Sequence, residues 1–168
     1  EGFYKEAITT MRQYFEHLLF AIFLSTSDFN YRLWRKGKYD MSWGRITDKD
    51  SGVFSEKFIE LYADDIDSDR SIGLLNACKN IYRECSEFVH GNYEKLDMLC
   101  EKLVYDSNNF QLYVKCFTSA QYIICMALFI RFRYILNDSE TLNDLELIIR
   151  DNIGTLKEVQ KIFNEEKY

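Results

Sequence analysis

Apolar side chains recur at intervals of three and four residues along much of the chain, which is the spacing of one face of an α-helix. The first such run extends from Phe3 to Leu24 and includes Ala7, Met11, Tyr14, Phe15, Leu18, Leu19 and Ile22. The polar residues 25–28 then interrupt the pattern. The spacing therefore predicts a long helix over Phe3–Leu24. The chain contains no proline, so nothing of that kind breaks its helices.

The same periodicity predicts several further helices. In chain order they are Glu56–Tyr62 capped by Ser55, a helix from Asp69 to Val89 or Gly91, Tyr93–Tyr105, and Phe110–Leu136. Thr141 and Asp144 resemble a capping pair for a last helix, which breaks near Gly154. The stretch Phe29–Gly52 is less regular and holds both tryptophans.

These elements predict an all-α fold, an antiparallel bundle of four to six helices joined by short polar turns. With 168 residues we expect a single helical domain over residues 1–168, which could belong to a longer chain. The longest uncharged run, Cys116–Ile130, has fifteen residues, fewer than the ~18–20 that span a bilayer. We therefore expect this run to form a core helix, and no membrane partner.

The number and spacing of the cysteines indicate the cellular compartment in which the chain is expected to fold. Their number, five, is odd, and no Cys-x-x-Cys pair occurs among them: Cys78, Cys85, Cys100, Cys116 and Cys125. Most lie among apolar residues, which favours buried free thiols in a reducing environment. The first twenty residues carry several charges and do not resemble a signal peptide. The expected location is the cytoplasm.

The net charge of −6 argues against a protein that coats long nucleic acids, because phosphate contacts usually require a basic surface. One local stretch, Tyr31–Tyr39, is basic and interleaved with aromatic residues, a mixture that binds phosphates and stacks bases. Its candidate RNA-binding residues are Arg32, Trp34, Arg35, Lys36 and Lys38. The alternative is an exposed loop whose Trp34 and Tyr39 anchor it to the bundle.

An acidic run at 64–69 lacks the glycine and the closing glutamate of a calcium-binding loop, so no metal site is expected there. Arg131 and Arg133 lie in the apolar helix. They could reach the surface, pair with this acidic run, or flank a dimer interface.

The segment from Ile81 to Tyr93 carries the strongest candidate chemistry. Arg83 and His90 are seven residues apart, so on a helix they lie almost on one line, with Ser86 and Glu87 between them. Histidine exchanges protons near neutral pH, and arginine binds phosphate oxygens with several N–H donors. Together they suit RNA cleavage by its own 2′-hydroxyl, which requires no metal and no cofactor.

Two alternatives remain for these residues. Arg83 and Glu87 could form a helical salt bridge, and His90 could interact with the helix dipole beside a terminating Gly91. Arg12 and His17 show that a similar spacing arises elsewhere, and we interpret His17 as a core or rim histidine.

The string Tyr82-Arg83-Glu84-Cys85-Ser86-Glu87-Phe88-Val89-His90-Gly91 resembles the active-site helix of the HEPN ribonucleases, whose motif is Arg, four to six residues, then His. Many family members carry Asn, Asp or His where this chain has Glu84. The resemblance implies a helical bundle with metal-independent endoribonuclease activity, found in bacterial toxin and phage-defence systems. It implies a homodimer in which two copies of the motif line one cleft, with Arg83 on the phosphate and His90 transferring protons. A regulatory partner protein or domain would fit such a system.

Two other functions fit the same sequence. One is a catalytically silent HEPN-like module for dimerisation or partner binding, in which Arg83 and His90 would be buried or paired internally. The other is an unrelated helical bundle that binds a small ligand in an enclosed apolar pocket.

Overall fold

The computed structural model describes residues 3–89 and 104–164, and across these two ranges the chain is helical and forms no strand. The prediction of an all-α fold is thus confirmed. The helices are α1 (Tyr4–Leu24), α2 (Asp28–Arg35), α3 (Trp43–Ile46), α4 (Glu56–Tyr62), α5 (Ser68–Val89), α7 (Ser107–Phe132), the 3-10 helix η1 (Arg133–Asn137), α8 (Ser139–Ile153) and α9 (Lys157–Asn164).

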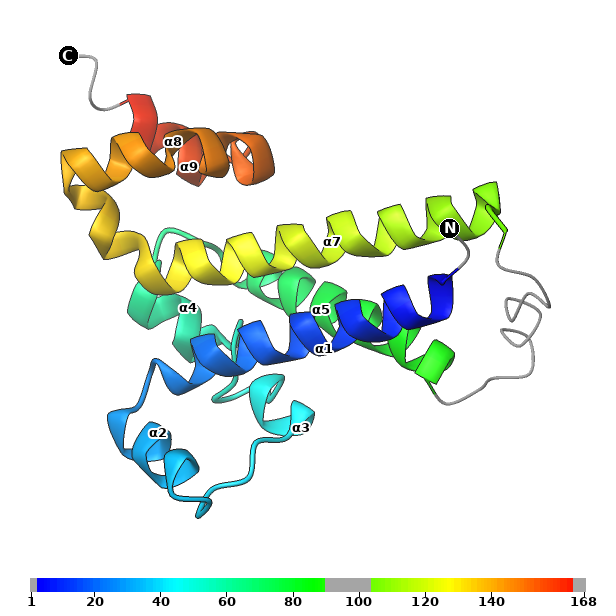
Figure 1. The fold of residues 1–168 in the computed structure, drawn as a ribbon. Helices are drawn as coiled ribbons and strands as arrows, with labels where there is room; N and C mark the ends of the chain where they lie inside the picture. Colours follow the sequence, from blue (N-terminus) through cyan, green and yellow to red (C-terminus); the bar gives the residue numbers. More distant parts are fainter. Residues whose placement is uncertain (1–2, 90–103, 165–168) are drawn as a thin grey trace.

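Three long helices, α1, α5 and α7, pack against one another and form the centre of the molecule (Figure 1). α5 runs opposite to α1 and α7, and α8 and α9 cover the far end of α7. Helix α1 contacts both of its long neighbours and buries Ile8, Met11, Phe15, Leu19 and Ile22. Each of these large side chains contributes about 1.5–3 kcal/mol when fully buried. The predicted apolar face is confirmed at Met11, Phe15, Leu19 and Ile22, whereas Tyr14 is 52% exposed and Ile8, which was not predicted, is fully buried.

Helix α2 corrects the prediction of an irregular stretch from Phe29. The Ser27 side chain accepts a hydrogen bond from the Asn30 N–H at 3.2 Å and caps the helix. Asp28 and Arg32 form an i,i+4 ion pair at 2.7 Å. None of the eight residues of α2 is buried. The helix was missed because local polar contacts, rather than a buried apolar face, hold it.

Polar caps also correct two predicted helix starts. α7 begins at Ser107 rather than Phe110, because the Asp106 side chain accepts a hydrogen bond from the Asn109 N–H at 2.7 Å. α8 begins at Ser139, because Asp138 accepts from both the N–H and the hydroxyl of Thr141. The capping pair predicted for Thr141 and Asp144 was therefore wrong.

Among the other predicted helices, some are confirmed and one lies mostly outside the described residues. α4 with its Ser55 cap, α5, and the break at Gly154 are confirmed. A Cβ on Gly154 would lie only 2.4 Å from the Arg150 carbonyl oxygen, so the break requires a glycine. The predicted helix Tyr93–Tyr105 lies outside the described residues except at its end, where Val104 and Tyr105 are not helical.

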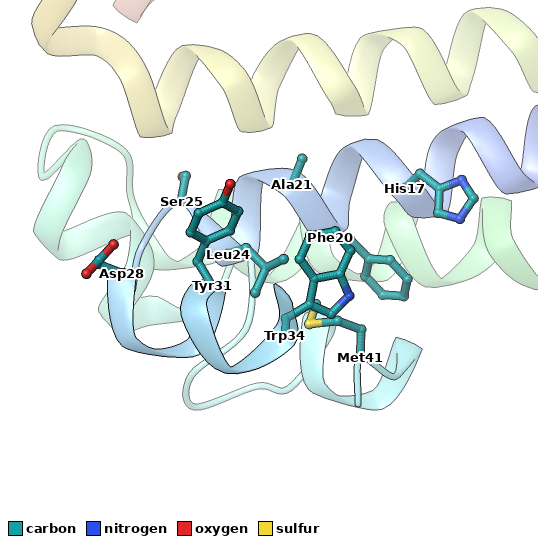
Figure 2. A pocket seen from close by; sticks show the side chains of 9 residues that line it. All are labelled: His17, Phe20, Ala21, Leu24, Ser25, Asp28, Tyr31, Trp34 and Met41. Carbon is teal, nitrogen blue, oxygen red and sulfur yellow. The ribbon is translucent and has the colours of Figure 1, made fainter. Parts of the chain in front are cut away.

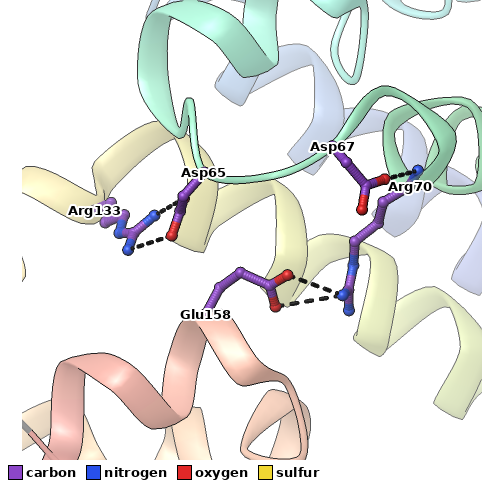
Figure 3. A network of polar contacts seen from close by, with 5 residues as sticks. All are labelled: Asp65, Asp67, Arg70, Arg133 and Glu158. Carbon is purple, nitrogen blue, oxygen red and sulfur yellow. Dashed lines mark hydrogen bonds and ion pairs between the residues drawn. The ribbon is translucent and has the colours of Figure 1, made fainter.

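The C-terminal helices are attached to the bundle by two ion pairs (Figure 3). Arg133 of η1 binds Asp65, which follows α4, and Arg70 of α5 binds Glu158 of α9 at 3.1 Å. Arg133 was expected to reach the surface, pair with the acidic run or flank a dimer interface, and the structure shows the pairing with the acidic run. Arg131 instead donates to the side chain and the carbonyl of Ser25 at the end of α1.

The positions of the cysteines and of the apolar helix match the expectation that both lie in the interior of the molecule. Cys78, Cys85 and Cys116 are buried, and burial raises the pKa of the Cys78 thiol to about 12. The stretch Ser107–Asn137 is long and apolar enough to cross a membrane by length and composition, but 44% of its most apolar window is buried inside the molecule. The expected core helix is thus found at Cys116–Ile130.

The two candidate caps of α8 can be separated by mutation. We expect Asp138→Ala to lower the midpoint of urea unfolding, because two donors of Thr141 lose their acceptor. Asp144→Ala removes an exposed carboxylate that makes no cap and serves as the matched control. Equal effects of the two substitutions would contradict the assignment of Asp138 as the cap.

The Asp65–Arg133 pair predicts a pH dependence of stability. Hydrogen bonding by Arg133 is the main cause that lowers the pKa of Asp65. A lowered folded-state pKa stabilises the fold above the unfolded value, ~3.9, and the stabilisation disappears as the pH falls through the folded value. In chemical unfolding from pH 7 to pH 3, we expect Asp65→Asn to be destabilised at pH 7 and to approach the wild type below about pH 4. Asp64→Asn, which removes a neighbouring charge without breaking the pair, provides the reference, and a gap that does not narrow at all as the pH falls from 4 to 3 would count against the pair.

Candidate functional site

The last two turns of α5 carry Arg83, Ser86 and Glu87, and His90 lies outside the described residues. The structure therefore places three of the four predicted catalytic residues. Arg83 is exposed, whereas Cys85 and Phe88 on the opposite side are buried in the core. Of the residues expected on one side of this helix, Arg83 therefore faces outward, while Ser86 and Glu87 are only partly exposed.

Arg83 differs from most other arginines in its contacts. Five arginines form ion pairs with carboxylates, namely Arg12, Arg32, Arg70, Arg133 and Arg150. Arg83 donates only a long hydrogen bond, 3.4 Å, to the Asn80 side chain, and within residues 3–89 and 104–164 it pairs with no carboxylate. The alternative salt bridge from Arg83 to Glu87 is thus not formed. An exposed guanidinium without a carboxylate is available to a phosphate.

Ser86 and Glu87 lie beside Arg83 and are partly buried. The Ser86 hydroxyl donates a 2.6 Å hydrogen bond to the Tyr82 carbonyl, one turn earlier in the helix. Its hydrogen is therefore occupied, and its lone pairs can still accept a hydrogen bond. Ser86 is better suited to positioning a substrate hydroxyl than to attacking phosphorus.

An aromatic and cationic stack supports α5 directly before Arg83. The Trp43 and Tyr82 rings are nearly parallel, 10° apart, with centroids at 3.9 Å. The Arg12 guanidinium lies 4.6 Å from the centre of the Tyr82 ring and donates a hydrogen bond to the Tyr82 hydroxyl. Trp43 also contacts Phe15 of the core. The stack joins α1, α3 and α5, and sequence periodicity gave no sign of it because its members are far apart in the chain.

The second Arg-to-His match does not form a site. Arg12 points to Tyr82 and lies 3.9 Å from Glu16, whereas His17 is exposed and lines a cleft between α1 and α2. The interpretation of His17 as a rim histidine fits this position. The two side chains diverge because five residues turn a helix by well over a full revolution.

The basic stretch predicted for RNA binding spans α2 and the turn that follows. Arg32, Trp34 and Arg35 belong to the helix, and Lys36 and Lys38 are exposed beyond it. Arg32 forms an ion pair with Asp28. Arg35 and the two lysines are therefore the cations of this stretch that a ligand can reach more easily. Trp34 is 47% exposed, so it is not an anchor buried in the core.

The cleft between α1 and α2 has a volume of about 650 Å³. Figure 2 shows Phe20, Trp34 and Met41 at its centre, His17 at one end and Asp28 at the other. A second, almost wholly apolar pocket of about 230 Å³ lies between α7, η1 and α8. It resembles the enclosed pocket expected of a small-ligand binder, but it is smaller than the roughly 300–1,000 Å³ of most ligand pockets.

Among the described side chains, no group of three or more His, Cys, Asp or Glu residues is arranged to hold a metal ion. Comparison of the chain with protein-family models, with curated proteins and with solved structures finds no match. The geometry of the molecule is therefore the basis for a functional proposal.

The stack behind Arg83 generates a test of its own. We expect Tyr82→Phe to lower the free energy of unfolding by about 1–3 kcal/mol, because the partly buried Arg12 guanidinium loses its hydroxyl acceptor. Tyr14→Phe removes the hydroxyl of a tyrosine on α1 that is 52% exposed, and it provides the control. Denaturant unfolding of the three proteins gives the comparison, and indistinguishable curves would mean that the hydroxyl contributes nothing.

Proposed function

We propose that this chain is a metal-independent endoribonuclease with an HEPN-like fold and a composite active site at a homodimer interface. The observation that carries the proposal is Arg83, an exposed arginine that no described carboxylate neutralises, on a helix whose other side is held in the core. The Arg83-to-His90 spacing and its surrounding string supply the resemblance to the family. A role in bacterial defence or as a toxin follows from that resemblance.

The proposed chemistry needs two proton transfers. A base takes the proton from the RNA 2′-hydroxyl, and the resulting oxygen attacks phosphorus and forms a cyclic phosphate. An acid gives a proton to the departing 5′-oxygen. Arg83 stabilises the negative charge that develops on the phosphate oxygens. Ser86 and Glu87 orient the reacting hydroxyl.

One histidine for each motif favours a dimer. Two copies of His90 in one cleft would provide a base on one side of the phosphate and an acid on the other. An apolar surface that could take part in pairing lies on the first half of α7, where Phe110, Val114 and Phe117 are exposed along one side of the helix. An apolar surface of this kind often marks an interaction site.

The same stripe supports a second candidate function, a catalytically silent HEPN-like module that binds a partner subunit or domain. Exposed apolar residues on α7 serve either role equally well. The two functions differ in whether Arg83 and His90 act on RNA.

Cleavage of total cellular RNA in EDTA distinguishes them. We expect the wild type to cleave, and both His90→Ala and Arg83→Ala to lose at least about 100-fold in rate, since general acid–base catalysis contributes 10²–10⁴-fold. Lys79→Ala removes an exposed cation one turn earlier on α5 and provides the matched control, which retains activity. Equal cleavage by wild type and His90→Ala would contradict the proposal. Absence of cleavage by every protein would favour the silent module.

A further inference from the structure

The cleft between α1 and α2 is a built feature of the molecule rather than a gap between loops. α2 lies over α1 without burying any of its own residues, although it carries Tyr31 and Trp34, which are 40% and 47% exposed. Large aromatic side chains ordinarily bury most of their surface. Here both line a cavity of about 650 Å³, which lies within the usual size range of ligand sites.

The lining of the cleft selects for a flat aromatic ligand. Phe20 comes from α1, Tyr31 and Trp34 come from α2, and Met41 closes the floor (Figure 2). Aromatic faces and a polarisable thioether favour a planar ring that stacks between them. The polar groups of the lining are His17, Ser25, Asp28 and the Tyr31 hydroxyl, and those not already paired can bond to the edge of such a ring.

The charge beside the cleft selects for an anion. Residues 31–39 carry four positive charges and no acid, so with a net charge of −6 for the whole chain the remaining residues carry −10. Arg32 is neutralised by Asp28, but Arg35 at the end of α2 and Lys36 and Lys38 beyond it are exposed cations. A planar ring attached to a phosphate is a nucleotide unit, and this is the ligand that both features fit together.

We propose that the α1–α2 cleft binds an unpaired nucleobase of single-stranded RNA, stacked on Trp34, with the adjoining phosphates on Arg35, Lys36 and Lys38. Bases in a duplex are already stacked and paired, so a double-stranded RNA cannot offer one to the cleft. The inference rests on the proposed function in one respect, namely that the nucleotide belongs to RNA.

The fold provides a short route from this cleft to the candidate active site. Met41 lines the cleft, and Trp43, two residues later, stacks on Tyr82, the neighbour of Arg83. Two residues extend over at most about 7 Å of chain. The segment 41–43 therefore links the cleft to the side of α5 that carries Tyr82.

The test measures binding separately from cleavage. A full-length His90→Ala chain, which keeps the RNA intact, is titrated against a fluorescein-labelled single strand of twelve nucleotides, the same strand in a duplex, and AMP. We expect the single strand to bind more tightly than the duplex and AMP. Trp34→Ala added to this chain weakens single-strand binding by about 5- to 150-fold, the range for the loss of one base–aromatic stack.

The structure offers a matched control and a rescue. Phe29 is an aromatic residue of α2 that is 70% exposed and does not line the cleft, so Phe29→Ala leaves binding unchanged. Trp34→Tyr keeps a ring for stacking and restores most of the affinity. Because α2 buries no residue, circular dichroism of these variants is expected to match that of the parent chain.

Three outcomes would overturn the inference: equal affinities of Trp34→Ala and Phe29→Ala, binding of the duplex as tight as that of the single strand, or binding of AMP as tight as that of the single strand. The last outcome would assign the cleft to a free nucleotide. Failure of the proposed nuclease gives a different pattern. In that case RNA binding depends on Trp34 while the wild type leaves RNA uncleaved.

Discussion

The burial of one face of α1 against both α5 and α7 is the contact on which the rest of the structure depends. The same helix contributes Phe15 and Leu19 to the core, Arg12 to the stack on Tyr82, and Phe20 to the cleft. These residues project from different sides of one rod, so their relative positions are set by the geometry of the helix. A shift of α1 by one turn would disturb the core, the support behind Arg83 and the wall of the cleft at once. The candidate site and the cleft thus derive their rigidity from the core.

Ion pairs engage six of the basic side chains among the described residues, namely Arg12, Arg32, Lys49, Arg70, Arg133 and Arg150. Arg70 and Arg133 attach the C-terminal helices, and Arg12 is enclosed between α1 and α5. Surface pairs such as Arg32 with Asp28 contribute little to stability, but they remove a charge from the set available to a ligand. Arg83, Arg35, Lys36 and Lys38 are among the exposed cations that remain available to an anionic ligand.

Much of the fold could be predicted from the sequence, because α1, α5 and α7 bury apolar faces whose periodicity is visible in the residue pattern. α2 could not be predicted in this way, since it buries no residue and its start is marked only by the Ser27 cap. The start of α8 was misplaced because Asp138 and Thr141 are both typical capping residues, and only geometry shows which of them accepts the hydrogen bonds. Polar local contacts are weak signals in a sequence, even where they determine where a helix begins.

The candidate site also has features that the sequence predicts and features that it does not. Helical spacing predicts that Arg83, Ser86 and Glu87 share one side of α5, and the structure agrees. The lack of a carboxylate partner for Arg83 among the described residues could not be predicted, because Glu87 stands at the i,i+4 spacing at which helical ion pairs form. The cleft and the stack of Trp43 on Tyr82 arise from residues that meet only after folding. Sequence analysis identifies the residues that can perform chemistry, and tertiary contacts decide which of them are free to do so.

The independence of α2 from the core has a consequence for how this protein can change over generations. Substitutions on a helix that buries no residue carry little penalty in folding, so they escape the selection that constrains α1, α5 and α7. Lineages could therefore alter the residues that line one wall of the cleft while the bundle stays the same. A scaffold with one such unconstrained helix can acquire new specificities rapidly, which is an advantage to any protein whose targets evolve to escape it.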